Sequence, residues 1–203
     1  MEFQQVVQRR RMVRRFTDDP VAQESIERMV RNAVRAPNAG FSQGWAFLVL
    51  DQPAQVAQFW DATTPPSKAA KPDSWLRGMR TAPVIIVPLS SKAAYLERYA
   101  EPDKGWTDKD ETRWAMPYWH IDTGMASLLI LQTAVDEGLG ACFFGVPPQR
   151  TDALRNAFRV PAEYTPIGAI AVGHPAPTEG SQGSVAKRKR KPLQDVVHYG
   201  RWS

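Results

Sequence analysis

Residues 118–137 restrict the fold more than any other part of the chain. Apolar side chains occupy nearly every face of a helix drawn through this stretch and leave only a narrow polar edge. The apolar residues include Ile121, Met125, Leu128, Leu129 and Val135. A surface helix needs a broad polar face, so a helix of this kind belongs at the centre of a fold. Gly138 and Gly140 end it. We therefore expect the other elements to be arranged around this helix.

A second segment, residues 82–90, reads APVIIVPLS. Its apolar run is continuous and bounded by prolines, which favours a strand buried on both faces. Further strands are expected at residues 45–50, 141–144 and 165–175, helices at residues 18–37, 56–62 and 149–158, and a loop at the polar residues 63–74. This order predicts an α/β sandwich. The chain of 203 residues, 43% of them hydrophobic, has room for one domain.

The chain lacks the glycine patterns of two common nucleotide-binding classes. Its glycine-rich stretch GLGACFFG, residues 138–145, has the wrong spacing after the second glycine. It also follows a helix, whereas the dinucleotide fingerprint of a Rossmann domain follows a strand. A phosphate-cradling P-loop is absent from the sequence as well. These observations argue against both classes.

Cysteine content and the N-terminus indicate the compartment. Cys142 is the single cysteine, so an intrachain disulfide cannot form, and residues 1–11 carry charge where a signal peptide needs an apolar run. The apolar run at residues 125–131 is far shorter than the about 20 residues of a membrane helix. We expect a cytoplasmic protein with no membrane association.

Residues 175–203 are predicted to be a linker and a C-terminal arm. The stretch begins with Pro, Gly and Ser and ends in a segment that reads as a strand, PLQDVV. This composition is typical of an arm that leaves the body of a domain. We expect one domain over residues 1–203, with residues 175–203 extending from it.

Two basic runs stand at opposite ends of the chain. RRRMVRRF, residues 9–16, holds five arginines, and KRKRK, residues 187–191, holds five Lys and Arg. Without these ten residues, sixteen Lys and Arg remain against 21 Asp and Glu. The excess positive charge is therefore local.

Arginines in this arrangement are suited to phosphate. In and just after a short N-terminal helix, Arg10 and Arg14 would share one face, and Arg11 and Arg15 another. Guanidinium groups present paired donors that match phosphate oxygens. A solvated basic face and a nucleic-acid surface are the alternatives, although the body is net acidic and shows no helix-turn-helix, zinc or RNA-binding motif.

Four segments, in order along the chain, resemble signatures of the nitroreductase family. RRMVRRF, followed by a helix and by APNAGFSQGWAFLVL, resembles the family's opening, whose usual pattern is RRSxRxF and then APSAGNxQPWxF. GLGACFFG, PIGAIAVGHP and KRKRKPLQDVV resemble later segments of that family. The similarity spans almost the whole chain.

The resemblance implies an architecture and a cofactor. The architecture is an α+β homodimer, a nitroreductase-like α/β sandwich with a central, mainly antiparallel sheet flanked by helices and with C-terminal arms swapped between subunits. The cofactor is FMN, bound noncovalently at two sites along the interface, so the anion expected at the arginines is its phosphate. The expected partners are a small aromatic acceptor and a second copy of the chain, without nucleic acid or membrane.

The resemblance also assigns cofactor-binding residues by motif match. They are Arg10, Arg11, Met12, Arg14, Arg188 and Arg190 at the phosphate and ribityl chain, Pro37, Asn38, Ala39 and Gln43 from the partner subunit, and Phe144 and Gly145 at the flavin ring. Fixed cations and N–H donors near N1 and O2 of the flavin raise its potential. A glycine such as Gly145 lets the backbone approach a ligand closely. A simple turn is the alternative for this glycine.

Some residues depart from the family pattern. Met12 stands where the family usually has serine, so only its backbone N–H can serve the ligand. Phe41 and Gly44 replace the usual Asn and Pro, which predicts a more apolar and more flexible loop. The Asn and Lys that the family often supplies near residues 75–80 have no clear counterpart, and Arg77 and Arg80 are candidate substitutes only.

An aromatic-rich region precedes and opens the central helix. It contains Trp106, Trp114, Tyr118, Trp119 and His120. These side chains would form either the roof of a substrate pocket or the core of a dimer interface, where Trp and Tyr are enriched. His120 could donate a proton to a reduced substrate, but a lone histidine is more often structural, so it is not counted as catalytic.

The implied activity is that of an NAD(P)H-dependent, FMN-containing oxidoreductase. In a ping-pong mechanism NADH or NADPH would deliver hydride to flavin N5, and an aromatic acceptor, a nitroaromatic or a quinone, would then take the electrons. We expect no catalytic side chain and no metal, because the flavin carries the chemistry. The physiological acceptor stays open, as does the choice among NADH, NADPH and a deazaflavin donor.

Three other functions stay open. A family member that uses oxygen or dehalogenates its substrate would need a lid over the flavin, and residues 101–114 are a candidate lid. A flavin-binding protein without turnover would act as a carrier or sensor. A nucleic-acid binder would lose affinity steeply with salt.

Overall fold

The computed structural model describes residues 1–177 and 188–202, and its centre is a five-stranded sheet. The long strands lie in the order β1-β2-β5-β3. The short β4 pairs with the C-terminal end of β2, beyond the part that pairs with β5. Every strand pairing is antiparallel. The strands are β1 (Trp45–Leu50), β2 (Val84–Ser90), β3 (Gly140–Phe144), β4 (Thr165–Pro166) and β5 (Ala169–Gly173). The expected mainly antiparallel sheet is confirmed.

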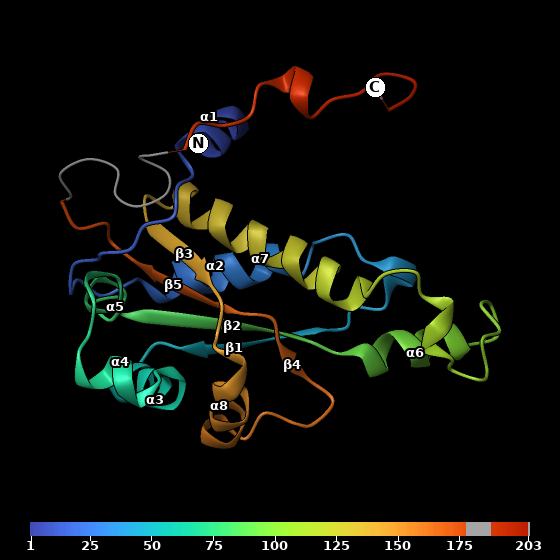
Figure 1. The fold of residues 1–203 in the computed structure, drawn as a ribbon, viewed down its shortest axis with the longest axis horizontal. Coiled ribbons are helices and arrows are strands. Elements are labelled where there is room, and N and C mark those ends of the chain that lie inside the picture. The colour runs from blue at the N-terminus through green and yellow to red at the C-terminus, as the bar shows by residue number, and fades with distance from the viewer. Residues whose placement is uncertain (178–187, 203) are drawn as a thin grey trace.

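Helices cover both faces of the sheet (Figure 1). On one face α2 (Gln23–Ala33) packs against α7 (Tyr118–Asp136), and on the other α3 (Pro53–Thr63) packs against α8 (Thr151–Phe158). The other helices and turns are α1 (Phe3–Arg9), α4 (Pro66–Ala70), α5 (Ser74–Met79), α6 (Lys92–Ala100), η1 (Ala39–Phe41), η2 (Glu111–Arg113), η3 (Pro148–Arg150) and η4 (Leu193–Asp195). The flanked sheet predicted from the sequence is therefore present.

β2 is buried along its whole length, as its uninterrupted apolar sequence predicts. Successive strand residues point to opposite faces. Ile85, Val87 and Leu89 pack with α3 and α8, whereas Val84 and Ile86 pack with α2 and α7. Burying each of these side chains contributes about 1.5–3 kcal/mol. β2 therefore contributes to both hydrophobic cores, one on each face of the sheet.

α7 lies close to its predicted bounds and faces the sheet with small and branched residues. Ala126, Ile130 and Ala134 are fully buried. The outer side of the same helix leaves Ile121 and Leu128 exposed by 41% and 45% in the single chain. α7 therefore has two apolar surfaces, as its sequence predicted: one packs on the sheet and the other faces outward.

Several regions differ from the prediction: the strand expected at residues 165–175 is divided into β4 and β5, α6 was not expected, and residues 63–74 and the arm differ as well. The loop expected at residues 63–74 contains α4, which begins with a proline at a first-turn position, where its fixed φ suits a helix. The strand expected near the end of the arm is wrong, since Val196 and Val197 follow the turn η4 and have no pairing strand. In Figure 1 the described end of the arm leaves the body beside α1. Residues 178–187, including Lys187 of the second basic run, lie outside the described residues.

Within the described ranges, no helix has both the length and the hydropathy that a membrane crossing requires.

Candidate functional site

The N-terminal segment of residues 10–16 lies beside β3. Met12 forms a parallel bridge with Ala141, and the Val13 N–H donates to the Ala141 carbonyl at 3.0 Å. Farther along, the Phe16 N–H donates to Thr81 Oγ1 at 2.9 Å. Backbone contacts therefore fix this segment, which leaves its arginine side chains free to serve another purpose.

The helix α1 ends at Arg9, so the arginines that follow are not helical. The prediction that Arg10 and Arg14 share a helix face is therefore wrong, because helical spacing does not apply after the turn at Arg10. Arg10 is half-buried, and Arg11 and Arg14 are exposed. Arg14 Nη1 donates to the Met12 carbonyl at 3.2 Å.

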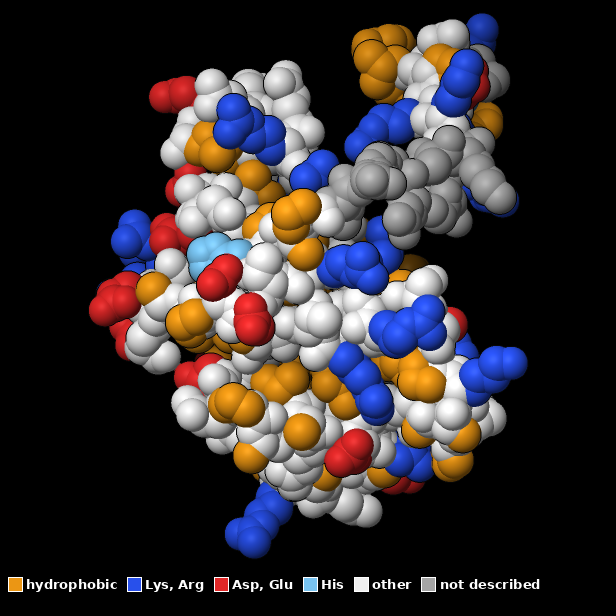
Figure 2. Space-filling view, turned by 90° about the vertical axis from the view of Figure 1, so that its left-hand side faces the viewer, with side chains coloured by type: hydrophobic (Ala, Val, Ile, Leu, Met, Phe, Trp, Pro, Cys, Tyr) orange, Lys and Arg blue, Asp and Glu red, His pale blue; other side chains and the backbone are white. Residues whose placement is uncertain are grey.

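The arginines of this segment have no acidic partner within the part of the chain that the structure describes: Arg10, Arg11, Arg14 and Arg15 are outside every ion pair found there. Figure 2 shows a run of Lys and Arg side chains across the middle of the face on which this segment lies. Clustered guanidinium groups without carboxylates repel one another, and an anion with several oxygens would relieve that repulsion.

Helix α5 packs against the same segment. A Cβ built on Gly78 would lie 2.3 Å from the Arg14 carbonyl oxygen, so only glycine allows this approach. The two candidate substitutes on this helix differ in their surroundings. Arg77 donates to the Pro72 carbonyl, and Arg80 lines a cavity described below.

Phe144 and Gly145 lie at the end of β3, three residues beyond Ala141. The Phe144 ring stacks on Trp60 with a centroid distance of 5.5 Å and an interplanar angle of 8°. Gly145 is exposed, and a Cβ built on it would meet nothing within 4 Å. The structure thus brings the arginine segment and the predicted flavin-ring residues to one edge of the sheet, about 10 Å apart along the strand.

The loop that contains Pro37, Asn38, Ala39 and Gln43 is strained. Gly40, Phe41 and Gln43 have φ values of 62°, 55° and 50°, and the latter two are not glycines. Left-handed backbone at such residues costs about 1–3 kcal/mol each and persists only where the surroundings impose it. The sequence-based expectation of a flexible loop does not describe this geometry.

Several hydrogen bonds impose the loop conformation. Asn38 Oδ1 accepts from the Gln43 N–H at 2.8 Å, and Ser42 Oγ donates to the Ala39 carbonyl at 2.6 Å. From outside the loop, Asp122 Oδ2 accepts from the Ala39 N–H at 2.8 Å, and Arg98 Nε donates to the Gly40 carbonyl at 2.8 Å. Pro37 is exposed.

Asp122, Tyr95 and Arg98 escaped the sequence-based prediction of site residues. Asp122 is 1% exposed within α7, and the fully buried Tyr95 donates its hydroxyl to it at 2.6 Å. Burial, together with this carboxylate, raises the pKa of Tyr95 above its ordinary value. The available signal was an acidic residue near the start of a helix that is apolar on nearly every face, since a buried carboxylate needs donors.

The loop and the arginine segment lie at opposite ends of the sheet. Trp45 follows the loop and pairs with Ser90, the last residue of β2. Met12 bridges Ala141, which is level through β5 with Val84, the first residue of β2. Six residue steps along a strand span about 20 Å. Because β1 and β3 are also opposite edges of the sheet, one chain does not bring the two sets together (Figure 1).

The first turn of α7 contains His120. Its Nδ1 lies 2.8 Å from the Oγ of the buried Ser90. Burial lowers the pKa of His120 below its ordinary value. The tryptophans of the preceding segment pack within the chain, since Trp114 lies 4.5 Å from Tyr99 and Trp106 lies 4.9 Å from it, between ring centroids. These contacts occur inside one chain and leave the pocket-roof and interface hypotheses untested.

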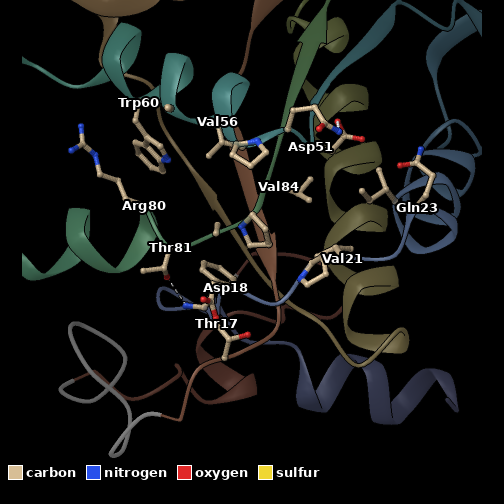
Figure 3. A pocket seen from close by; sticks show the side chains of 18 of the residues that line it. Thr17, Asp18, Val21, Gln23, Asp51, Val56, Trp60, Arg80, Thr81 and Val84 are labelled. Atoms are coloured by element: carbon tan, nitrogen blue, oxygen red, sulfur yellow. Dashed lines mark hydrogen bonds between the residues drawn. The ribbon is translucent and has the colours of Figure 1, made fainter.

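A cavity of about 1080 Å³ lies at the Val84 end of the sheet (Figure 3). Phe16, Val56, Trp60 and Val84 are among its walls. The buried indole N–H of Trp60 has no acceptor among the described residues. None of the predicted cofactor-binding residues lines this cavity, so it is separate from the expected site.

The two arginines of the C-terminal run are exposed. Arg188 and Arg190 take part in no ion pair within residues 188–202 or with the described body. The described arm also exposes large apolar side chains: Leu193 (75%), Tyr199 (91%) and Trp202 (86%). Exposed apolar groups of this size favour association with another surface.

Comparison with known proteins places this geometry in context. A sequence profile of the nitroreductase family matches residues 7–174. The chain is 24% identical over 184 residues to a protein from Methanothermobacter thermautotrophicus named as an NADH dehydrogenase/NAD(P)H nitroreductase, covering 90% of this chain and 82% of the relative. It is 23% identical to the FMN reductase (NADPH) of Bacillus subtilis, covering 93% of this chain and 69% of the relative.

Solved structures share the fold. A nitroreductase from Desulfovibrio desulfuricans in complex with FMN has a TM-score of 0.70 at 23% identity and covers 100% of this chain and 99% of its own. A BluB-like flavoprotein from Clostridium difficile has a TM-score of 0.72 at 20% identity and covers 99% of this chain and 100% of its own. The sheet and its flanking helices therefore form an architecture found in known flavoproteins.

Proposed function

The chain belongs to the nitroreductase family, and from this premise we propose that it is an FMN-dependent oxidoreductase that passes electrons from NADH or NADPH to a small aromatic acceptor, a nitroaromatic or a quinone. When bound, FMN supplies the hydride chemistry, accepting a hydride at N5 from the donor and releasing the electrons to the acceptor after the oxidised donor departs. The protein's part is to bind and orient the cofactor and to exclude competing reactions.

The observation that carries the proposal is a set of arginines that have no acidic partners in the described part of the chain and lie beside an open strand end. Arg10, Arg11 and Arg14 provide a donor set that fits a phosphate dianion. Charge-assisted hydrogen bonds of this kind each contribute about 1.5–3 kcal/mol. Met12 packs its side chain into both cores, so its backbone is the part of this residue that remains for the ligand.

The end of β3 fits a flat ring. Gly145 leaves its Cβ position open, and the stacked and edge-on contacts of Phe144 with Trp60 and Trp75 hold the adjacent side chain in place. A rigid backbone with no side chain in the way allows a ring to lie close to it. The separation between this point and the arginines lies along one strand, which suits an elongated ligand with a phosphate at one end.

The proposal includes a homodimer. The loop of Asn38, Ala39 and Gln43 and the arginines lie at opposite ends and opposite edges of one sheet, so they meet at one FMN only if two copies contribute. The exposed apolar side chains on α7 and on the arm are surfaces that such a second copy would cover. Arg188 and Arg190 would reach the phosphate through the arm.

Three names among the relatives support the choice of cofactor and donor, namely an FMN complex, an FMN reductase (NADPH) and an NAD(P)H nitroreductase. The single cysteine suits work in the reducing cytoplasm. The open strand end described above supports an aromatic acceptor, because it leaves room for flat molecules near the proposed flavin ring.

The test is a visible absorption spectrum of the purified full-length protein, followed by anaerobic addition of NADH or NADPH. A yellow protein that bleaches, and regains its colour when menadione or a nitroaromatic is added, supports the proposal. A protein that takes up no FMN and whose binding to DNA weakens steeply with salt would replace it with the nucleic-acid interpretation of the basic runs.

A further inference from the structure

We propose that Tyr95, Arg98 and Asp122, called the clamp here, are positioning residues that hold residues 38–44 in the conformation that meets FMN and tie this loop to residues 101–117. The inference rests on the proposed function, because it concerns the same cofactor site. The three residues come from α6 and α7, and none of them is among the residues expected to touch the cofactor.

Asp122 anchors the loop through a buried carboxylate. Its Oδ2 accepts from the Ala39 N–H at 2.8 Å and from the Tyr95 hydroxyl at 2.6 Å. A buried carboxylate is costly unless donors surround it, so a movement of Ala39 would leave part of this group without a partner. The loop position is therefore tied to the hydrogen bonding of the buried Asp122 carboxylate.

Arg98 links the loop to the segment that follows α6. Its Nε donates to the Gly40 carbonyl at 2.8 Å, and its two terminal nitrogens pair with both oxygens of Asp103 at 2.7 and 2.8 Å. A planar guanidinium that makes both contacts fixes their relative orientation. The same hydrogen bonds hold the pKa of Asp103 below its ordinary value.

Two glycines of the loop fit against two tyrosine rings. A Cβ built on Gly40 would lie 2.6 Å from the Tyr99 ring, and one built on Gly44 would lie 2.5 Å from the Tyr95 ring. The absence of side chains therefore serves close packing. This explains Gly44, which stands where the family usually has proline: a side chain there would displace the Tyr95 ring and its hydroxyl from Asp122.

The tyrosines contact residues 101–117 on their other sides. Tyr99 packs on Trp106 and Trp114, and Tyr95 meets Trp114 edge-on at 5.8 Å between centroids. A displacement of these tryptophans by an acceptor would press on the rings that hold the loop. The clamp thus gives the aromatic segment a physical connection to the cofactor loop of the same chain, which in the proposed dimer serves the other copy's FMN.

The first experiment compares Tyr95→Phe with the matched control Tyr164→Phe in the full-length protein. Tyr164 packs its ring against the core and its hydroxyl has no hydrogen bond within the described residues. Hydrogen–deuterium exchange is measured on FMN-free protein. We expect peptides covering residues 38–44 to exchange about tenfold faster in Tyr95→Phe and at the wild-type rate in the control, because one charged hydrogen bond is lost.

The second readout is the cofactor itself. In Tyr95→Phe, the dissociation constant of FMN is expected to rise about tenfold, and the midpoint potential of the bound flavin to shift, with the melting temperature close to that of the control. A lowered melting temperature with unchanged loop exchange and unchanged potential would overturn the proposal, because Tyr95 would then be a packing residue only.

Arg98→Lys provides an independent variant at a less buried position. Lysine keeps a positive charge for Asp103 but lacks the planar set of donors through which Arg98 contacts both Asp103 oxygens and the Gly40 carbonyl. Faster exchange of residues 38–44 with unchanged exchange of residues 101–105 supports the clamp, and wild-type exchange of the loop contradicts it. Failure of the proposed function reads differently, since wild-type protein would then take up no FMN while the exchange measurements still report on the clamp.

Discussion

Two regions of this chain are expected to touch FMN, each at a different one of the two sites of the proposed dimer, and they are built in opposite ways. In residues 10–16 the backbone is fixed against β3 while the arginine side chains have no acidic partners among the described residues. In residues 37–43 the backbone is strained and held by buried groups, among them Asp122. One region leaves charge available, and the other prepares geometry in advance.

The difference indicates what each region requires from its ligand. The arginine segment is stabilised only when an anion binds, because its guanidinium groups repel one another without it. The loop has already been ordered at the expense of folding free energy, so it loses little entropy on binding. Ligand binding should therefore stabilise the first region more than the second.

The largest effect is expected from a chain that ends at Gly180, which removes the arm. Loss of Arg188 and Arg190 removes two charged contacts of about 1.5–3 kcal/mol each, so FMN affinity should fall by more than about a hundredfold. Analytical ultracentrifugation and flavin content measure the outcome. A soluble, flavin-loaded truncation that remains a dimer would contradict both the swapped arm and the role of its arginines.

Arg10→Ala should weaken FMN binding by about 1.5–3 kcal/mol while hardly changing the stability of the FMN-free protein, because the side chain has no acidic partner within residues 1–177 and 188–202. Isothermal titration with FMN and thermal unfolding without it separate the two quantities. The matched control is Arg35→Ala, which removes an exposed arginine just beyond the C-terminal end of α2. Equal FMN affinity in the two variants would return the basic run to a solvated surface.

Gly44→Ala and Gly145→Ala sharpen the comparison with one chemical change. The new Cβ at Gly44 would meet the Tyr95 ring and the Ser91 carbonyl within 2.8 Å, whereas the one at Gly145 would meet nothing. We expect the free energy of unfolding to fall by about 1–3 kcal/mol for Gly44→Ala and by less than about 0.5 kcal/mol for Gly145→Ala. Chemical denaturation of the FMN-free proteins checks this, and equal losses would refute it.

The sequence predicted the elements whose burial follows from their own pattern. The strand at residues 84–90 is almost wholly apolar and the helix at residues 118–136 is apolar on nearly every face, so both had few alternative positions. α6 and α4 were missed because their short sequences carry no strong periodicity. The strand expected in the arm has no partner among the described residues, and pairing is what defines a strand.

The same division holds within the candidate site. The arginines and Gly145 are visible in the sequence because charge and glycine are local properties. The contact between Ala39 and Asp122 joins residues 83 positions apart, and no local pattern encodes such a contact. The loop strain is equally hidden, since Phe41 and Gln43 are not residues that normally indicate left-handed backbone. The arginine cluster could therefore be predicted from the sequence, whereas the loop conformation and its contact with Asp122 could not.

The smallest effect is expected from acid, and it should reach the loop side alone. Burial lowers the pKa of His120, which neighbours Ser90 at the loop end of the sheet. A histidine whose pKa is lower in the folded than in the unfolded state contributes stability above its unfolded pKa of about 6.5, and this contribution is lost as the pH falls through the folded pKa. Between pH 7.5 and pH 5, hydrogen exchange in residues 38–44 of FMN-free protein, corrected for the intrinsic pH dependence of exchange, should therefore rise, while exchange in residues 10–16 should not.

Two histidine variants test the source of this rise. His120→Gln should remove it, because His120 lies at the loop end of the sheet, whereas the matched His174→Gln, beside the arginine segment, should retain it. A rise that survives in His120→Gln would assign the acid response to another group.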